Sequence, residues 1–319
     1  MHIRNTFFFL ILFLATAAKL HAQQAPIFTH HSNTAAYVNP GFAGISEGIL
    51  LNGIIRQQWA GFKDSEGNKV TPETYLITGD LPIKILRGGV SAAIVQDQLG
   101  FENNIGVQLG YSYHLELGGS ILGLGGAFNF VNRTVDFSKH DPIEPDDPIL
   151  PKSEESAMLV DFNLGVYWSV LEQYYVGFSV TSLLKSKSKN LVDASTSSSS
   201  FVGDRTFYLV AGYQFSIPTL PTLEFFPSMS IMSNIASTQY NLTAKIQHNK
   251  KVWGGVNYRY QESIGLMVGF NIKDIHIGYA YDINTLGLGI PGSHEIFVSY
   301  CFKLDLDKTP RIYSNPRYL

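Results

Sequence analysis

Hydrophobic and polar residues alternate with a period of two along most of the chain after residue 46. The segment 104–115, NIGVQLGYSYHL, places Ile, Val, Leu and Tyr on one face and Asn, Gly, Gln, Ser and His on the other. Segments at 163–170, 252–260 and 293–302 repeat this pattern, and at 206–215 Val210 interrupts it. A period of two predicts β-strands with one apolar face and one face of small or polar side chains. A soluble β-sandwich and a membrane barrel both produce this alternation.

The pattern predicts an all-β fold of about 14 antiparallel strands. The predicted strand boundaries are accurate to roughly two to four residues. The predicted strands are residues 47–59, 72–82, 87–96, 103–116, 119–132, 157–170, 173–183, 205–217, 223–234, 238–249, 251–261, 263–271, 274–283 and 293–304. An even number of strands returns the chain to its starting side. If the N-terminus is periplasmic, the connections after odd-numbered strands therefore face outward.

The lengths of the connections favour a membrane barrel over a sandwich. Connections after odd-numbered strands include the polar stretch 133–156, the Ser-rich stretch 184–204 and GFKDSEGNKV at 61–70. Connections after even-numbered strands are almost all short, as in LELGGS, LEQY, HNKK and NIKD. Bacterial outer-membrane barrels sort their connections in this way, and a soluble sandwich has no reason to do so. After residue 22 no apolar run reaches the roughly 20 residues of a spanning helix, so a membrane location requires a closed barrel.

The two ends of the chain differ from the strand pattern. The first residues, MHIRNTFFFLILFLATAAKLHAQQ, contain Arg4, an apolar run at 7–14 and small residues up to Ala22. They predict a secretory signal peptide, because the apolar run is too short for a membrane anchor. We expect a signal peptide at 1–22, a periplasmic N-terminal segment at 23–46, an outer-membrane β-barrel at 47–304 and a short C-terminal tail at 305–319. The only cysteine is Cys301, which excludes an internal disulfide and a lipid-bearing cysteine near residue 22.

Composition supports an export-type β protein and argues against nucleic-acid binding. Hydrophobic residues make up 45% of the chain, aromatic residues 13% and charged residues only 15%, against roughly 25% charged residues in soluble domains. The 17 Tyr, 21 Phe and 29 Gly are strand and turn formers. A formal net charge of -3 provides no basic patch for nucleic acid.

The sequence contains no recognisable catalytic, cofactor or metal motif. His30 with His31, His140 beside Asp141, and His294 beside Glu295 lack metal-ligand or triad spacing. HExxH, GxSxG, CxxC and P-loop motifs are absent, and the glycines of GGAFNF lie in a strand, where they permit close packing inside a barrel. We therefore predict a protein that is not an enzyme, with no catalytic residues and no cofactor.

Three alternatives for individual features stay open. The acidic segment DPIEPDDPILP, with Asp141, Glu144, Asp146 and Asp147, is a candidate calcium loop, although its prolines favour an extended, solvated loop. The run STSSSS at 195–200 is most simply interpreted as a flexible loop. A barrel-embedded hydrolase could assemble Ser, His and Asp from separate strands, and such side chains would converge near one rim.

Three blocks of residues resemble a known family. They are Asn39, Pro40, Ala43 and Gly44 of NPGFAG with Arg56, Gln58 and Trp59 of RQQW; Asp97 and Gly100 of DQLG; and Tyr281, Asp282, His294 and Glu295 near the last strand. In this order they are similar to the PorP/SprF family, outer-membrane barrel components linked to the type IX secretion system and gliding motility of Bacteroidota. Gly41 stands where the family usually has Ala. The chain also continues past Phe302, so its last aromatic strand is not at the very end.

The resemblance implies a barrel in the cell outer membrane that supports secretion or surface attachment of a partner protein, such as an adhesin or a gliding-related protein. It implies as partners type IX secretion-system or peptidoglycan-associated periplasmic proteins, a secreted cargo with a C-terminal secretion domain, and outer-membrane lipid. The alternative is a porin or substrate-selective transporter, whose lumen would be water-filled and lined with charges. The lumen-facing residues are instead mostly Gly, Ser, Asn and Gln with a few bulky ones such as Tyr208, which favours a plugged or partner-filled barrel.

The motif residues also have local structural interpretations. Asn39-Pro40 and Ala43-Gly44 are typical of a turn that leads into the first strand. Arg56 shares a face with Asn52 and Gln58, so we expect it to point into the lumen and to pair with Glu295 of the last strand, its neighbour in a closed barrel. A buried arginine needs a carboxylate partner. The other interpretation is a solvated lumen residue without a partner.

Overall fold

The computed structural model describes residues 25–46, 48–63, 67, 70–139, 153–171, 173–187, 202–216, 218–287 and 289–303. The predicted signal peptide, the candidate calcium loop, the STSSSS run and the predicted C-terminal tail lie outside these residues.

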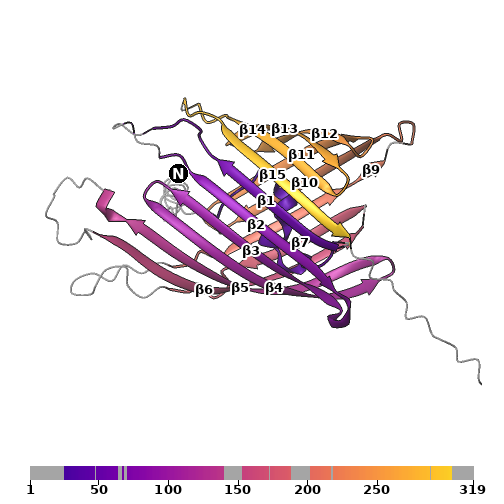
Figure 1. The fold of residues 1–319 in the computed structure, drawn as a ribbon, viewed down its shortest axis with the longest axis horizontal. Coiled ribbons are helices and arrows are strands. Elements are labelled where there is room, and N and C mark those ends of the chain that lie inside the picture. Colours follow the sequence, from indigo (N-terminus) through magenta and orange to yellow (C-terminus); the bar gives the residue numbers. More distant parts are fainter. Residues whose placement is uncertain are drawn as a thin grey trace, which may run out of the picture.

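The strands form one closed antiparallel barrel (Figure 1). Its strands are β1 (Gly48–Gln57), β2 (Glu73–Ile83), β3 (Gly88–Leu99), β4 (Glu102–Leu117), β5 (Ser120–Asp136), β6 (Glu154–Val170), β7 (Tyr174–Thr181), β8 (Thr206–Tyr213), β9 (Phe215–Ser216), β10 (Leu223–Ser233), β11 (Thr238–His248), β12 (Val252–Arg259), β13 (Ser263–Ile272), β14 (Ile275–Asn284) and β15 (Ser293–Lys303). Each strand pairs with its sequence neighbours, and β1 pairs with β15 to close the ring.

The fourteen predicted strands are all present, since β9 only continues β8 along the same partner, β10. The interruption falls at Gln214, whose N–H donates to the Gln173 carbonyl at 2.7 Å instead of to β10. Strands β5 and β6 are longer than predicted and extend to Asp136 and from Glu154. Their added residues are mostly polar and hydrogen-bond across the pair, so hydrophobic alternation could not reveal them.

The two faces of each strand have the predicted character. In β6, Leu164, Val166 and Trp168 point outward with 42 to 45% of their surface exposed, whereas Asn163 and Tyr167 are buried at 1% and 4%. Apolar side chains on the outside of a closed barrel suit a lipid environment, because every backbone group of the wall is paired within it. Polar and aromatic side chains fill the inside.

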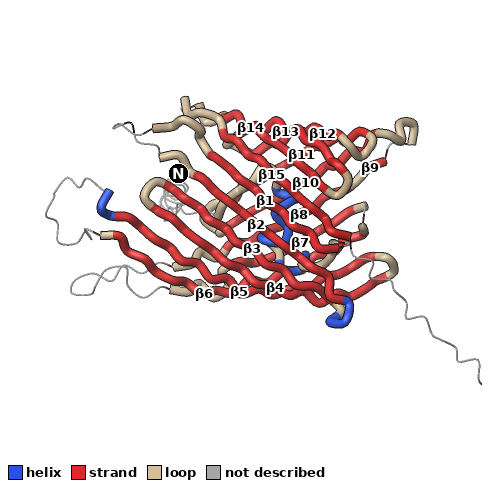
Figure 2. The backbone as a smooth tube through the Cα atoms, viewed as in Figure 1, coloured by secondary structure: helices blue, strands red, loops and turns tan. Residues whose placement is uncertain are grey.

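The connections separate by side as the sequence predicted (Figure 2). The long connections, 58–72, 137–153, 182–205 and 285–292, follow β1, β5, β7 and β14, and these four strands all end at one mouth. The connections at the other mouth, such as 118–119, 171–173 and 273–274, are short. We call these ends the long-connection mouth and the short-connection mouth.

Short helices complete the described structure. η1 (His31–Thr34), α2 (Ala35–Val38) and η2 (Pro40–Phe42) precede the first strand, while η3 (Lys84–Leu86) and η4 (Phe137–Lys139) lie in connections. None of the helices among the described residues is long and apolar enough to span a membrane.

Candidate functional site

The N-terminal segment 25–46 lies inside the barrel (Figures 1 and 2). Ala25 and Ile27 line a cavity together with Trp59 and Gln261 from the long-connection mouth. At its other end, Gly44 and Ser46 donate hydrogen bonds to Asp80, close to the short-connection mouth where β1 begins. The segment therefore runs through the lumen from one mouth to the other. We expected a periplasmic N-terminal segment at 23–46, and its described residues form a plug within the barrel.

The plug begins with a cluster of buried charges. Arg56 donates from Nη1 to Glu295 Oε2 at 2.9 Å and from Nη2 to Asp282 Oδ2 at 2.8 Å. The backbone N–H groups of Thr29 and His30 donate to the two oxygens of Glu295 at 2.8 and 2.7 Å, and the Thr29 hydroxyl donates to Asp282. The carboxylates thus hold the barrel arginine and the plug backbone at the same time.

The predicted ion pair between Arg56 and Glu295 is confirmed. Strand register explains it, because Arg56 faces Glu295 directly across the β1–β15 pair. Sequence reasoning missed a second cation, Arg259 of β12, which donates to Glu262 at 2.7 Å and lies 3.6 Å from Asp282. Both arginines thus lie against carboxylates, of which Asp282 and Glu295 are buried and Glu262 is 27% exposed. Buried charges need such partners.

Histidines fix the same end of the plug to the aromatic wall. The His30 ring lies 4.6 Å from the ring of Phe297 and 5.9 Å from that of Trp253, and its Nδ1 lies 2.7 Å from Glu295. Burial lowers the pKa of its neighbour His31 to about 4, an effect opposed by Glu295 and increased by Arg259 and His30. His31 is therefore neutral at pH 7.

The central part of the plug depends on donors from the barrel wall. Helices of three or four residues leave most of their carbonyl groups without partners in the helix. Gln108 donates to the Tyr37 carbonyl at 3.2 Å, Ser179 to the Val38 carbonyl at 2.6 Å, and Ser112 to the Gly41 carbonyl at 3.0 Å. The small polar residues predicted to line the lumen thus complete the hydrogen bonding of the plug.

Asn39 and Pro40 pack against Gly125 of β5 and Gly165 of β6, which we call the glycine floor. The Asn39 side chain accepts from Gly41 N–H at 2.9 Å to start η2, and donates to the carbonyls of Val166 and Phe178 in β6 and β7. A Cβ atom at Gly125 would overlap the Pro40 backbone, and one at Gly165 would overlap the Asn39 side chain. Gly125 thus permits the close packing that the sequence predicted for GGAFNF, and Gly165 does the same on β6.

Ala43 and Gly44 form the turn into the first strand, as expected. Ala43 is fully buried, and its carbonyl contacts His114 Nε2 at 2.9 Å. Gly44 has φ +73°, and its Cα lies against Gly89 of β3 so closely that a side chain on either residue would overlap the other backbone. A residue other than glycine would be strained at Gly44 both in conformation and in space.

The remaining motif residues lie elsewhere. Gln58 and Trp59 line the cavity at the long-connection mouth, as does Asp97, which accepts from the Thr74 hydroxyl at 2.6 Å. Gly100 has φ +57° in the tight turn between β3 and β4. Tyr281 and His294 face outward as a cross-strand pair with rings 5.1 Å apart, so they do not contact the plug.

A cavity lies on each side of the plug. The outer cavity, at the long-connection mouth, has a volume of about 800 Å³ and is lined by arginines such as Arg133 together with carboxylates such as Glu102 and Asp161. The inner cavity, at the short-connection mouth, has about 490 Å³ and is lined by Tyr175, Phe226 and other aromatic residues. Within the described part of the chain the two cavities share no lining residue, and residues of the plug line both of them.

The chemistry of this arrangement is that of a fixed closure. Its carboxylates are occupied by arginines and backbone N–H groups, and among the described residues no group of three or more His, Cys, Asp or Glu could hold a metal ion. The features that sequence reasoning missed are Thr29, Arg259 and Ser179, whose roles depend on a segment folding back into the barrel. Alternation along a strand gives no sign of such a partner.

Comparisons with known proteins agree with the fold. The family model described as Type IX secretion system membrane protein PorP/SprF matches residues 20–300. No curated protein matches the sequence. The chain is similar to the crystal structure of the Ralstonia pickettii toluene transporter TbuX, with a TM-score of 0.51 and 12% identity over 85% of this chain and 94% of that one. It is also similar to the CymD monoaromatic hydrocarbon channel, with a TM-score of 0.50 and 11% identity over 85% of this chain and 93% of that one.

Proposed function

Because this chain belongs to the PorP/SprF family of type IX secretion system membrane proteins, we propose that it supports secretion or surface attachment of a partner protein. In this role it is a non-enzymatic barrel of the cell outer membrane. Its partners are other secretion-system or peptidoglycan-associated periplasmic proteins and a secreted cargo with a C-terminal secretion domain.

The observation that carries this proposal is the closed lumen. The plug is fixed to β15 and β14 by buried carboxylates and to β4 and β7 by hydrogen bonds to its carbonyls. A segment held on all sides leaves no path for a protein chain through this barrel. The protein therefore acts as a membrane-embedded support for other components, and the exported chain crosses the membrane elsewhere.

The long connections supply a surface for a partner. They follow strands that all end at one mouth, which faces outward if the orientation follows that of bacterial outer-membrane barrels. In this orientation Ala25 and Ile27 also lie at the outer mouth, although β1 starts at the periplasmic side. The short-connection mouth then faces the periplasmic components of the assembly.

An affinity purification tests the proposal. The protein, tagged at its C-terminus, is solubilised from outer membranes in detergent, and bound proteins are identified by mass spectrometry against a similarly tagged, unrelated barrel. We expect secretion-system components or one large surface protein to be recovered with this chain and not with the unrelated barrel. Recovery of an unaccompanied barrel that conducts ions in planar bilayers would overturn the proposal.

A substrate-selective transporter is the second candidate, because a cavity lies on each side of the plug. The neighbours TbuX and CymD are named as a toluene transporter and a monoaromatic hydrocarbon channel, but identities of 12% and 11% relate only the folds. In a transporter the plug must move to join the cavities. Disulfide-linked cysteines at Ser179 and Val38 would then abolish uptake, and they would leave a supporting role intact.

A further inference from the structure

We propose that the inner cavity binds a small aromatic carboxylate: a flat apolar ring packs against its aromatic wall and the carboxylate pairs with Lys245. The cavity opens at the short-connection mouth, where Leu171 and Gln173 form its rim. Its volume of about 490 Å³ lies in the range of small-molecule sites. This inference does not depend on the proposed role in secretion.

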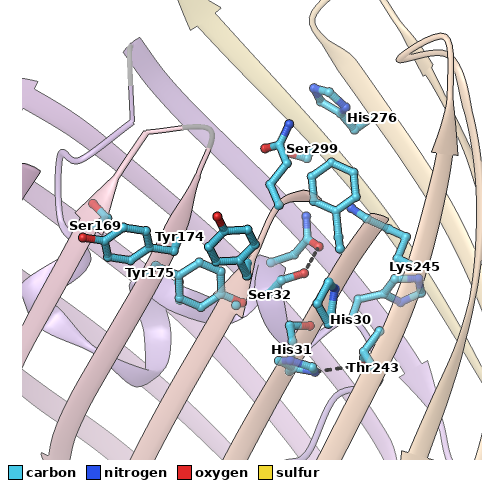
Figure 3. A pocket seen from close by; sticks show the side chains of 18 of the residues that line it. His30, His31, Ser32, Ser169, Tyr174, Tyr175, Thr243, Lys245, His276 and Ser299 are labelled. Carbon is cyan, nitrogen blue, oxygen red and sulfur yellow. Dashed lines mark hydrogen bonds between the residues drawn. The ribbon is translucent and has the colours of Figure 1, made fainter. Parts of the chain in front are cut away.

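The ionisable side chains of the described residues that line the inner cavity include basic residues and no acidic ones. Its lining includes Lys245, His30, His31 and His276, and no Asp or Glu among the described residues. Figure 3 shows these four side chains coming from the plug and from two strands. The outer cavity, by contrast, mixes arginines with carboxylates. An anion entering from the short-connection mouth therefore meets cationic and neutral groups alone.

Lys245 lines the cavity without a close counter-ion among the described residues, and the charge of Glu224 reaches it only from farther away. Its Nζ lies 4.6 Å from the ring centre of Phe226 and 5.4 Å from that of Trp253, and no carboxylate in the described residues pairs with it within 4.0 Å. Glu224 of the neighbouring strand β10 is nearest in register, but it does not line the cavity and pairs with Lys250 at 3.9 Å. A partly buried ammonium beside aromatic rings gains a strong partner when a carboxylate enters.

Several buried polar atoms of the lining also lack a hydrogen-bond partner among the described residues. They include Nε2 of His31 and Oγ of Ser169, on residues that are 7% and 6% exposed. Buried polar groups normally find a hydrogen-bond partner, and one left without costs about 1–3 kcal/mol. Both belong to residues labelled in Figure 3 around the cavity. A carboxylate oxygen would accept a hydrogen bond from the Ser169 hydroxyl, and from Nε2 of His31 in the tautomer that carries the ring proton there.

The aromatic residues determine the shape of the ligand. Trp253 and Phe297 lie nearly parallel with ring centres 5.9 Å apart, and Tyr167 and Tyr175 are stacked at 5.6 Å on the other side of the cavity. Flat rings pack well on such faces. One lysine is a point charge and suits a single carboxylate, whereas a phosphate favours several cations or an arginine fork.

Such a carboxylate has two sources, a free aromatic acid and the C-terminus of a peptide that ends in an aromatic residue. The full-length protein in lipid nanodiscs is therefore titrated with 2-naphthoate, with uncharged 2-naphthalenemethanol, and with the peptide Gly-Gly-Phe bearing a free or an amidated C-terminus. Binding is followed by isothermal titration calorimetry and ligand-observed NMR. We expect each carboxylate form to bind at least about tenfold more tightly than its uncharged counterpart.

The variant Lys245→Met should weaken 2-naphthoate binding about tenfold or more, and Lys245→Arg should restore it. Lys273→Met changes an exposed lysine at the same mouth that does not line the cavity, so it should leave binding unchanged. Heat-dependent gel migration confirms that each variant is folded. Binding of 2-naphthoate alone assigns the site to free acids, and tighter binding of the peptide assigns it to C-termini. Equal affinity for naphthoate and the alcohol, or for wild type and Lys245→Met, overturns the proposal.

Discussion

The two ends of the plug are held in opposite ways. At Thr29 and His30, the barrel supplies charge, since Arg56, Asp282 and Glu295 surround the backbone with ionic and charge-assisted hydrogen bonds. At residues 39–44, the barrel supplies space, since glycines of β3, β5 and β6 let the plug backbone approach the wall. Charge and absence of side chains therefore perform the same task at two sites of one segment.

The difference matters for what each end tolerates. A charged cluster in a closed lumen is costly when incomplete, because every remaining charge keeps its desolvation cost without its partner. The glycine floor is sensitive instead to steric overlap, because protein interiors are close-packed and an added methyl group would collide with the plug backbone. Substitutions that disrupt one end of the plug at a time distinguish the two modes of attachment.

The largest effect is expected from Arg56→Ala. Removing the guanidinium leaves Glu295 and Asp282 buried with fewer cations, which should destabilise the plugged barrel by about 3–5 kcal/mol. Guanidinium-induced unfolding in lipid vesicles measures this loss, and ion conductance in planar bilayers should rise if the plug leaves the lumen.

Arg56→Lys should recover only part of the stability, because an ammonium cannot contact both carboxylates through a planar fork. Arg87→Ala serves as the control, since Arg87 is exposed in a connection with no ion pair among the described residues. Wild-type stability in Arg56→Ala would show that the ion cluster does not hold the plug.

Acidification should weaken the same end through His31. The folded-state pKa is lowered to about 4, so between pH 6.5 and 4 the unfolded chain takes up a proton that the folded chain does not. Stability from this group is therefore complete above pH 6.5 and falls as the pH decreases, by up to about 3 kcal/mol. Unfolding at pH 7 and pH 4.5 measures the loss.

His31→Gln is the comparison that isolates this group, because Glu295, Arg259 and His30, which also face it, are the same in both proteins. The variant should lose less stability than the wild type over the same pH interval. An identical pH dependence of the two proteins would exclude His31 as its source.

The sequence predicted the wall of this protein better than its contents. The period of two and the sorting of connections gave all fourteen strands and the lumen face, and the Arg56–Glu295 pair followed from first and last strands being neighbours. These are local or nearest-neighbour properties. Opposite charges at facing positions of adjacent strands can be recognised directly in the sequence.

The path of residues 25–46 could not be predicted in this way. Gly125, Gly165 and Gly177 read as ordinary small lumen residues, and only the structure shows that the turn after Asn39 presses on them. Val210 and Tyr208, which depart from the pattern of small lumen residues, pack against Ile45 and Val38 of the plug. These bulky inward residues, together with the scarcity of charged residues on the lumen face, were the signals of a lumen partner that the sequence offered.

A single methyl group tests the glycine end. Gly125→Ala places a Cβ against the Pro40 backbone, and neither strand β5 nor the proline ring can move freely. We expect a loss of about 1–3 kcal/mol, measured by unfolding in vesicles. Faster hydrogen exchange at residues 39–44 than in the wild type would locate the effect in the plug.

Gly53→Ala is the matched control. Gly53 also lies within a strand, but a Cβ there meets no atom within 4 Å, so the change should be neutral or slightly stabilising. Equal effects of the two substitutions would mean that the glycine floor does not set the position of the plug.

The smallest effect is expected from single wall donors. Ser179→Ala removes the hydrogen bond to the Val38 carbonyl and should cost about 1 kcal/mol, whereas Ser156→Ala, at an exposed bond to Asn132, should stay within about 0.5 kcal/mol of wild type. Ser112 and Ser179 lie three strands apart, on β4 and β7, so a rigid plug should show additive losses in the double variant. A double loss clearly smaller than the sum would mean that one broken bond already frees the central plug, and then the charged end alone would hold the segment in the lumen.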